Sequence, residues 1–145
     1  MDLDGVVTIG RRSQFLVIAS TSRADGTIAS ALVNAGVLAH PLTGERIVGL
    51  VSQPGVRVRN LRARPHATVS FRAEWSYATV EGTAELAGPD DPLPGIDDER
   101  LRLLLREIFT AAGGTHDDWD EYDRVMAKER RAVVLIAPTR VYSNG

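Results

Sequence analysis

The sequence predicts an α+β domain built on an antiparallel β-sheet of about six strands. Short apolar, β-branched segments alternate with turns rich in Gly, Pro and Asp from residue 15 to residue 86. Two amphipathic helical segments follow, and a last apolar strand returns after them. With 145 residues, 43% of them hydrophobic, the chain suits a single domain, residues 1–145. Such a sheet forms a barrel if its edges meet.

Each element is predicted from a local pattern. The Asp25-Gly26 pair suits the tight turn of a first hairpin. The expected strands are apolar or alternate apolar with polar residues, and they cover residues 15–21, 27–37, 46–51, 66–72, 77–86 and 132–136. Leucines at helical spacing predict a helix over residues 97–112, and an aromatic stripe predicts another over residues 117–128. Pro138 is expected to close the last strand.

The most informative segment is residues 52–65. Ser52 is expected to cap a short helix, Pro54 to lie in its first turn, and Pro65 to end it. The helix carries four arginines, at positions 57, 59, 62 and 64. Helical spacing places Arg57 and Asn60 on one outward face, while Val58 and Leu61 pack inward.

This helix has two interpretations. The first backbone amides of the helix, between Ser52 and Val56, the positive end of the helix dipole and Arg57 can converge on a phosphate. Alternatively, the arginines form a solvated basic face on a connecting helix. Composition alone leaves both interpretations open. Arg62 and Arg64 are the arginines that we expect to be solvated charges only.

Composition argues against several classes of partner. The net charge is −2, from 17 basic and 19 acidic residues, so neither nucleic acid nor a membrane is expected as a partner. The absence of cysteine excludes disulfides and thiol chemistry. The first four residues include two aspartates, Asp2 and Asp4, where a signal peptide is basic, and no apolar run approaches the roughly 18 residues of a membrane span. We therefore expect a cytoplasmic protein.

No metal site is expected. His40, His66 and His116 are scattered, without a second ligand at helical spacing. Residues 117–123 hold five acidic side chains, but they contain no Gly for the turn of a calcium loop. Acidic residues at a helix start are explained by the helix dipole.

Several segments together resemble the deazaflavin (coenzyme F420) and FMN-binding proteins of the pyridoxamine 5′-phosphate oxidase-like split β-barrel superfamily. The matching segments occur in the expected order and cover residues 15–26, 53–65, 66–71, 75–86, 116–122 and 130–136. The resemblance implies a split barrel with short helices. It also implies a homodimer with cofactor sites at the interface, because so small a barrel leaves a ring-sized cleft open on one side.

The resemblance also implies which residues bind the cofactor. In the F420-binding branch, a Lys or Arg three residues before an Asn-Leu pair contacts the phosphate, and that position is Arg57 before Asn60 and Leu61. Where relatives carry a second basic residue, two positions earlier, this chain has Gly55. The remaining expected contacts are strand residues along the ring system (Val33, Asn34, Leu50, Val51, Ser52), the helix start (Val56) and two aromatics from the partner subunit (Trp75, Tyr77).

The implied function is that of an F420-dependent oxidoreductase that transfers hydride between reduced deazaflavin and a small unsaturated or carbonyl-conjugated substrate. The cofactor ring supplies this chemistry, so no catalytic side chain is predicted. Two alternatives stay open. One is an FMN-dependent oxidase or reductase of the same fold, and the other is a cofactor-binding or sequestering protein without turnover.

Overall fold

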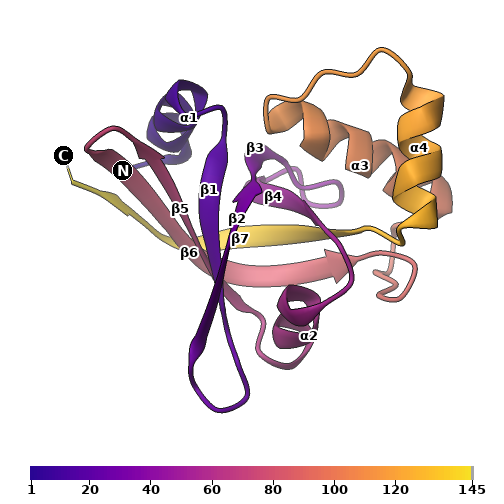
Figure 1. The fold of residues 1–145 in the computed structure, drawn as a ribbon, viewed down its shortest axis with the longest axis horizontal. Coiled ribbons are helices and arrows are strands. Elements are labelled where there is room, and N and C mark those ends of the chain that lie inside the picture. Colours follow the sequence, from indigo (N-terminus) through magenta and orange to yellow (C-terminus); the bar gives the residue numbers. More distant parts are fainter. Residues whose placement is uncertain (145) are drawn as a thin grey trace.

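The computed structural model describes residues 1–144, which fold into a seven-stranded antiparallel sheet and four helices (Figure 1). The elements in chain order are α1 (Leu3–Arg12), β1 (Leu16–Ser22), β2 (Ile28–Asn34), β3 (Gly36–Ala39), β4 (Arg46–Ser52), α2 (Val56–Ala63), β5 (His66–Ala73), β6 (Ser76–Ala87), α3 (Asp98–Ala111), α4 (Trp119–Lys128) and β7 (Ala132–Ser143). The strand order is β2-β1-β5-β6-β7-β4-β3. Within residues 1–144 the edge strands β2 and β3 do not pair with each other, so the sheet is curled but not closed.

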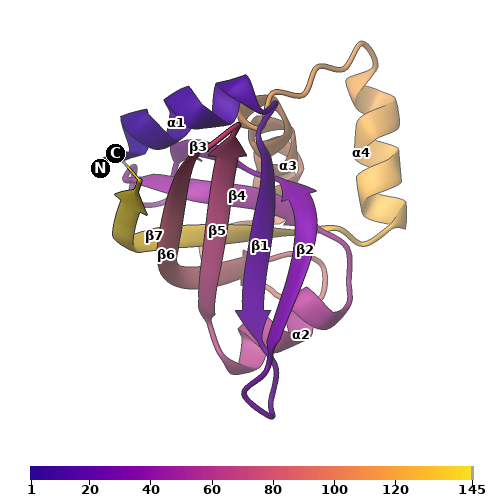
Figure 2. The ribbon, with the colours of Figure 1, turned by 60° about the vertical axis from the view of Figure 1, so that its left-hand side comes forward.

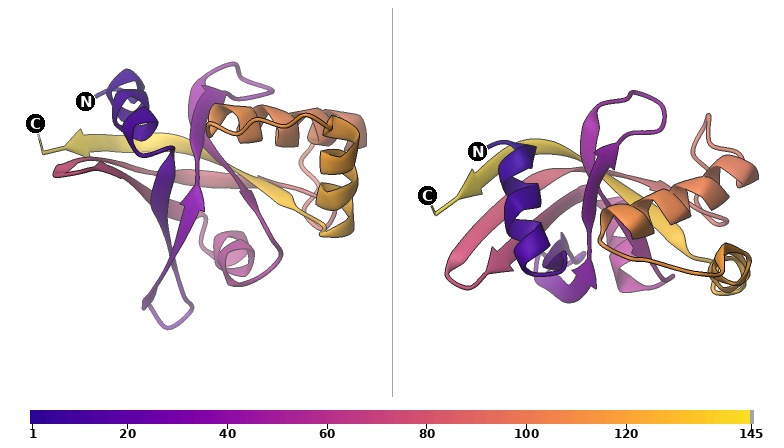
Figure 3. Two further views of the ribbon diagram at one scale, coloured as in Figure 1. Left: turned by 45° about the horizontal axis from the view of Figure 1, so that its top comes forward. Right: turned by 90° about the horizontal axis from the view of Figure 1, so that it is seen from above.

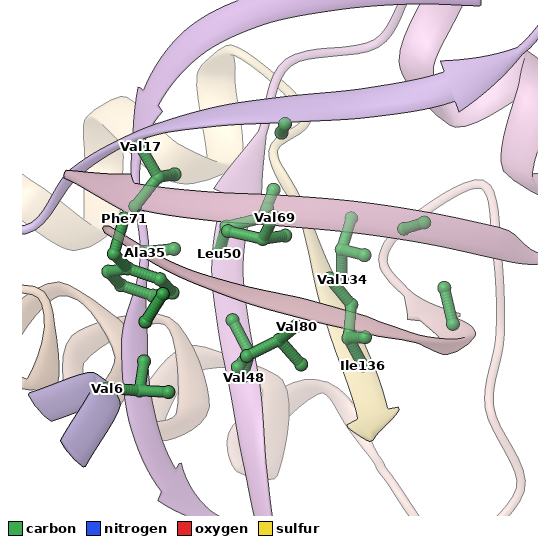
Figure 4. Packing of buried hydrophobic residues seen from close by; sticks show 14 of the residues in the cluster. Val6, Val17, Ala35, Val48, Leu50, Val69, Phe71, Val80, Val134 and Ile136 are labelled. Atoms are coloured by element: carbon green, nitrogen blue, oxygen red, sulfur yellow. The ribbon is translucent and has the colours of Figure 1, made fainter. Parts of the chain in front are cut away.

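The curl of the sheet creates the main core. In Figure 2, β2, β1, β5 and β6 run side by side, and β7 and β4 cross behind them. Figure 4 shows Val69 of β5 beside Leu50 of β4, with Val17 and Phe71 packed nearby. All four side chains are at most 1% exposed. At about 25 cal/mol per Å² of buried apolar surface, this core supplies the main stabilisation of the fold.

A second apolar cluster lies where the helical pair meets the sheet. Leu104 and Ile108 of α3 pack with Tyr122 of α4 against Val133 and Leu135 of β7. Figure 3 shows α3 and α4 gathered at one end of the molecule and α1 at the other. Among residues 1–144, no helix is both long and apolar enough to cross a bilayer.

The helix α1 was not expected from the sequence. The Asp2 carboxylate caps it by accepting a hydrogen bond from the Gly5 amide at 3.1 Å. Val6 and Ile9, three residues apart, face the core and are nearly inaccessible to solvent. Asp2 therefore begins a helix. The spacing of Val6 and Ile9 was the pattern in the sequence that indicated this helix.

The expected strand over residues 27–37 is two strands. β2 ends at Asn34, and β3 starts at Gly36 and pairs with β4 instead of β1. A side chain at Gly36 would place its Cβ 2.4 Å from the Ala111 carbonyl carbon of α3. The chain therefore changes partner at the point where only Gly lets the strand pass this close to the end of α3. This break raises the number of strands from about six to seven.

The last strand continues through Pro138 to Ser143, so the expectation that Pro138 ends it was wrong. Pro138 lies opposite Gly82, where the register of β6 and β7 shifts at a bulge between Glu81 and Gly82. A proline lacks the amide that a regular ladder requires, and a bulge is a position where that amide is dispensable.

The helix α2 starts later than expected. Ser52 is the last residue of β4, and its hydroxyl donates to the Gln53 carbonyl at 3.0 Å instead of capping the helix. Pro54 precedes the helix, and Gly55 occupies the N-cap position without a side-chain cap. The amides of the first turn therefore have no capping side chain of their own.

Candidate functional site

Two cavities adjoin at Arg57. The main cavity, of about 430 Å³, lies between the ends of β2 and β4, α2, and the helical pair; its lining is Val33, Asn34, Val51, Gln53, Arg57, Ile108, Phe109, Ala112, Tyr122, Met126 and Arg131. The second cavity, of about 360 Å³, lies between the β1–β2 hairpin and the start of α2; its lining is Ala19, Thr21, Arg23, Ala29, Ser30, Ala31, Ser52, Gln53, Pro54, Gly55, Val56 and Arg57. Gln53 and Arg57 belong to both.

Arg57 is a cation without a carboxylate partner in the described part of the chain. Its Nε donates to the Ser52 hydroxyl at 3.2 Å, which fixes the side chain against the end of β4. Burial lowers the pKa of its guanidinium, and the positive charge of Arg131 lowers that pKa further. An arginine keeps its charge despite such a shift, so the site holds a partly desolvated positive charge. An anion is the guest that such a charge favours.

The other arginines of this segment have different roles. Arg62 makes a two-pronged ion pair with Asp91, at 2.6 and 2.8 Å. Arg64 donates to the Ser22 carbonyl at 2.9 Å and to the Asn60 side-chain oxygen at 3.3 Å. Arg62 remains 44% exposed in its ion pair, whereas Arg64 is partly buried and links α2 to β1. Arg59 is exposed and lines neither cavity.

Gly55 shapes the start of α2 through its backbone. Its φ of 156° and ψ of −154° lie in a region that side-chain-bearing residues rarely adopt. No atom lies within 4 Å of the position that a Cβ would occupy, so the space above this turn is open. At the position where the resemblance implies a second basic residue, this chain therefore has a glycine turn with open space beside it.

The expected cofactor contacts divide into three groups. Val33, Asn34 and Val51 line the main cavity, Ser52, Gly55 and Val56 line the second, and Arg57 lines both. Leu50 and Asn60 line neither and are buried. Trp75 and Tyr77 line neither cavity. They lie at the β5–β6 turn, which β5, eight residues and roughly 25 Å long, separates from α2.

The Asn60 side chain is occupied within the fold. It is 6% exposed, its amide donates to the Thr21 hydroxyl at 3.1 Å, and its oxygen accepts from Arg64. The outward face expected for Asn60 was wrong, because this polar side chain links α2 to β1. Because the amide nitrogen and the amide oxygen of Asn60 both have partners within the protein, this side chain has a structural role.

Sequence reasoning missed the far wall of the main cavity. Ile108, Phe109, Tyr122 and Met126 come from the helical pair, and Arg131 from the segment that follows it. The rings of Phe109 and Tyr122 are in contact, with their centroids 5.1 Å apart and their planes tilted by 49°. The aromatic stripe of α4 could be predicted from the sequence. Its position opposite the ends of β2 and β4 could not. Arg131 had no local signal beyond a pair of arginines before the last strand.

The main cavity offers little acid–base chemistry. Burial raises the pKa of Tyr122 to about 12, and its hydroxyl donates to the Leu105 carbonyl at 2.9 Å. The Asn34 amide donates to the Gln14 carbonyl at 3.1 Å. None of the residues lining this cavity is Asp, Glu or His. Among residues 1–144, no group of three or more His, Cys, Asp or Glu could hold a metal ion.

No protein-family model matches the chain. Solved structures do resemble it. A conserved hypothetical protein of Mycobacterium tuberculosis, Rv2991, matches 99% of this chain and 84% of its own, with a TM-score of 0.69 and 17% identity. A pyridoxamine 5′-phosphate oxidase-related, FMN-binding protein of Nostoc punctiforme matches 97% of this chain and 82% of its own, with a TM-score of 0.66 and 11% identity.

A protein described as an F420 reductase matches 89% of this chain and 90% of its own, with a TM-score of 0.59 and 16% identity. These matches extend over nearly the whole of this chain, including its antiparallel sheet and short helices. This chain has the pyridoxamine 5′-phosphate oxidase-like split-barrel fold. The split-barrel prediction is thus confirmed, while identities this low show the fold alone.

Proposed function

We propose that this split-barrel protein is an F420-dependent oxidoreductase. It would transfer hydride between reduced deazaflavin and a small unsaturated or carbonyl-conjugated substrate. The observation that carries the proposal is Arg57, a partly buried cation without a carboxylate partner in the described residues, placed where two cavities meet. One structural neighbour is described as an F420 reductase, which supports the same function.

The residues around Arg57 fit a phosphate-bearing ring cofactor. Arg57 and the open first turn of α2 provide donors for the phosphate, since Gly55 leaves that turn uncovered. Val33 and Val51 provide apolar contact for a flat ring in the main cavity. A deazaflavin, when bound, supplies the hydride chemistry. The chain's own residues position it, exclude water and supply the compensating positive charge.

The first test is cofactor binding, followed by fluorescence polarisation of oxidised F420. We expect Arg57→Ala to weaken binding by about 1.5–3 kcal/mol, as for the loss of a charge-assisted hydrogen bond. Arg59→Ala is the matched control, because it removes an equal charge from the same helix outside both cavities. Equal binding by wild type and Arg57→Ala would place the phosphate elsewhere, and no binding at micromolar protein would reject F420.

We further propose that the protein acts as a homodimer. β2 is an edge strand whose side chains are mostly exposed, including Ile28 at 59% and Leu32 at 65%. Leu16 and Ile18 on the neighbouring strand are also exposed, at 41% and 44%. A second subunit that covers these apolar side chains would also close the cavities beside β2, and could bring Trp75 and Tyr77 to the cofactor.

FMN is the alternative cofactor. It carries a phosphate and a similar ring, and one structural neighbour is described as FMN-binding. A yellow protein that releases FMN on heating would favour it over F420. The lack of Asp, Glu or His in the main cavity favours the third possibility, a cofactor-binding protein without turnover. Steady-state reduction of an enone or quinone by the reduced, cofactor-loaded protein would reject that possibility.

A further inference from the structure

The main cavity has a second arginine on its far wall. Arg131 lies just before β7, and its amide donates to the carbonyl of Met126, another lining residue, at 3.0 Å. Its side chain is 23% exposed, so much of it is withdrawn from water. Arg131 also acts electrostatically on Arg57, since its charge contributes to the lowered pKa of that residue.

Two like charges across one cavity are unfavourable without a counterion. None of the residues lining the cavity is acidic. Arg131 does have a carboxylate neighbour, Glu129, to which its Nε donates at 3.0 Å and its Nη2 lies at 2.9 Å from the same oxygen. Glu129 does not line the cavity, and its side chain is 39% exposed, so solvent screens this pair.

The geometry of the Arg131–Glu129 pair leaves a donor for another acceptor. Both contacts use a single Glu129 oxygen, and in residues 1–144 the Nη1 nitrogen of Arg131 has no hydrogen-bond partner. The pair therefore orients the guanidinium without exhausting its five donors. Between the two arginines the lining is largely apolar, from Val51, Ile108, Phe109 and Met126.

We propose that Arg131 is a second anion-binding residue and that the molecule bound beside the cofactor is a small, flat, apolar carboxylate. This inference rests on the proposed function for the assignment of Arg57 to the cofactor phosphate. Arg57 then serves the cofactor and Arg131 the substrate, so each anion neutralises one of the two facing charges. An apolar wall with one fixed donor group at its end selects an apolar body with one charged end.

The test compares a charged and a neutral probe of equal shape. Cinnamate and cinnamamide are titrated by calorimetry into the protein, both without cofactor and loaded with oxidised F420. Wild type is expected to bind cinnamate at least tenfold more tightly than cinnamamide. Arg131→Gln is expected to abolish that preference while changing the dissociation constant of F420 less than twofold. Arg131→Lys, which keeps the charge, should retain most of the preference.

Arg130→Gln is the matched control, because it removes the neighbouring positive charge, which does not line the main cavity. It should leave the preference for cinnamate unchanged. Glu129→Gln removes the competing carboxylate and should strengthen cinnamate binding. Circular dichroism melting confirms that each variant is folded.

Several outcomes would overturn the assignment of Arg131. These are equal binding of the two probes to wild type, no binding of either at millimolar concentration, a preference that survives Arg131→Gln, or loss of F420 binding in that variant. Failure of the proposed function looks different: the protein would not bind F420 at all. The titrations without cofactor, repeated in Arg57→Ala so that Arg131 is the remaining cation of the cavity lining, would then still decide whether Arg131 selects carboxylates.

Discussion

Single residues at close contacts control where this chain turns. Gly36 is the clearest, because a Cβ there would lie 2.4 Å from the Ala111 carbonyl carbon and 2.6 Å from its oxygen. The backbone of a packed helix cannot move aside to relieve such a clash, whereas a flexible side chain can. We expect Gly36→Ala to lower the free energy of unfolding by about 2–4 kcal/mol, measured by urea denaturation.

Gly44→Ala is the matched control for Gly36→Ala. Gly44 has a positive φ of 74° but no atom within 4 Å of a Cβ, so its substitution tests backbone strain without a clash. Its cost should be about 1 kcal/mol. Equal costs at the two positions would show that the contact with α3 does not constrain the β2–β3 break.

At the scale of elements, one carboxylate joins the two helices that form the far wall of the main cavity. Asp123 of α4 accepts from Arg106 at 2.9 Å and from Arg102 at 2.9 Å, both on α3. Its side chain is 16% exposed. Hydrogen bonds from Arg106 and then Arg102 lower the pKa of Asp123 below its ordinary value, although burial opposes them.

This lowered pKa makes the link sensitive to acid. The charged carboxylate stabilises the fold fully above the ordinary Asp pKa of about 3.9, and this contribution is lost as pH falls through the lowered value. We expect Asp123→Asn to cost about 1–3 kcal/mol at pH 7, with a smaller difference from wild type at pH 3. Denaturant unfolding at the two pH values measures this.

Asp120→Asn is the control for Asp123→Asn. Asp120 lies in the first turn of the same helix, is exposed, and makes no ion pair within residues 1–144. Its replacement should cost less than about 1 kcal/mol, through the helix dipole and a solvent-screened attraction to Arg106. If both variants lost the same stability at both pH values, the link between α3 and α4 would not depend on the Asp123 charge.

At the scale of the whole molecule, the exposed apolar face of β1 and β2 is the feature that the monomer leaves unexplained. In the proposed homodimer this face is covered. Leu32→Glu should therefore shift the protein from dimer to monomer in analytical ultracentrifugation, because a carboxylate would have to be buried at the interface. The same variant should bind F420 more weakly than wild type.

Leu42→Glu provides the comparison for Leu32→Glu. Leu42 is 51% exposed but lies in the turn between β3 and β4, away from the β1–β2 face. This variant should remain a dimer and keep its affinity for F420. A monomeric wild type at working concentration would contradict the proposed arrangement directly.

The periodic elements and the basic helix could be predicted from local patterns in the sequence. Alternation along β5 and β6, the Asp25-Gly26 turn and the leucine stripe of α3 are local patterns, and the structure confirms these elements. Arg57 was found in the same way, because an arginine near a helix start is visible without knowledge of its neighbours.

The partners of the polar side chains depend on packing between distant segments and could not be predicted. Asn60 pairs with Thr21, 39 residues away, and Arg62 with Asp91, 29 residues away, so helical spacing could not assign their roles. The break at Gly36 and the far wall around Arg131 likewise depend on α3 and α4 folding back onto the sheet. Periodicity records which face of an element is apolar, whereas packing between distant segments selects the partner.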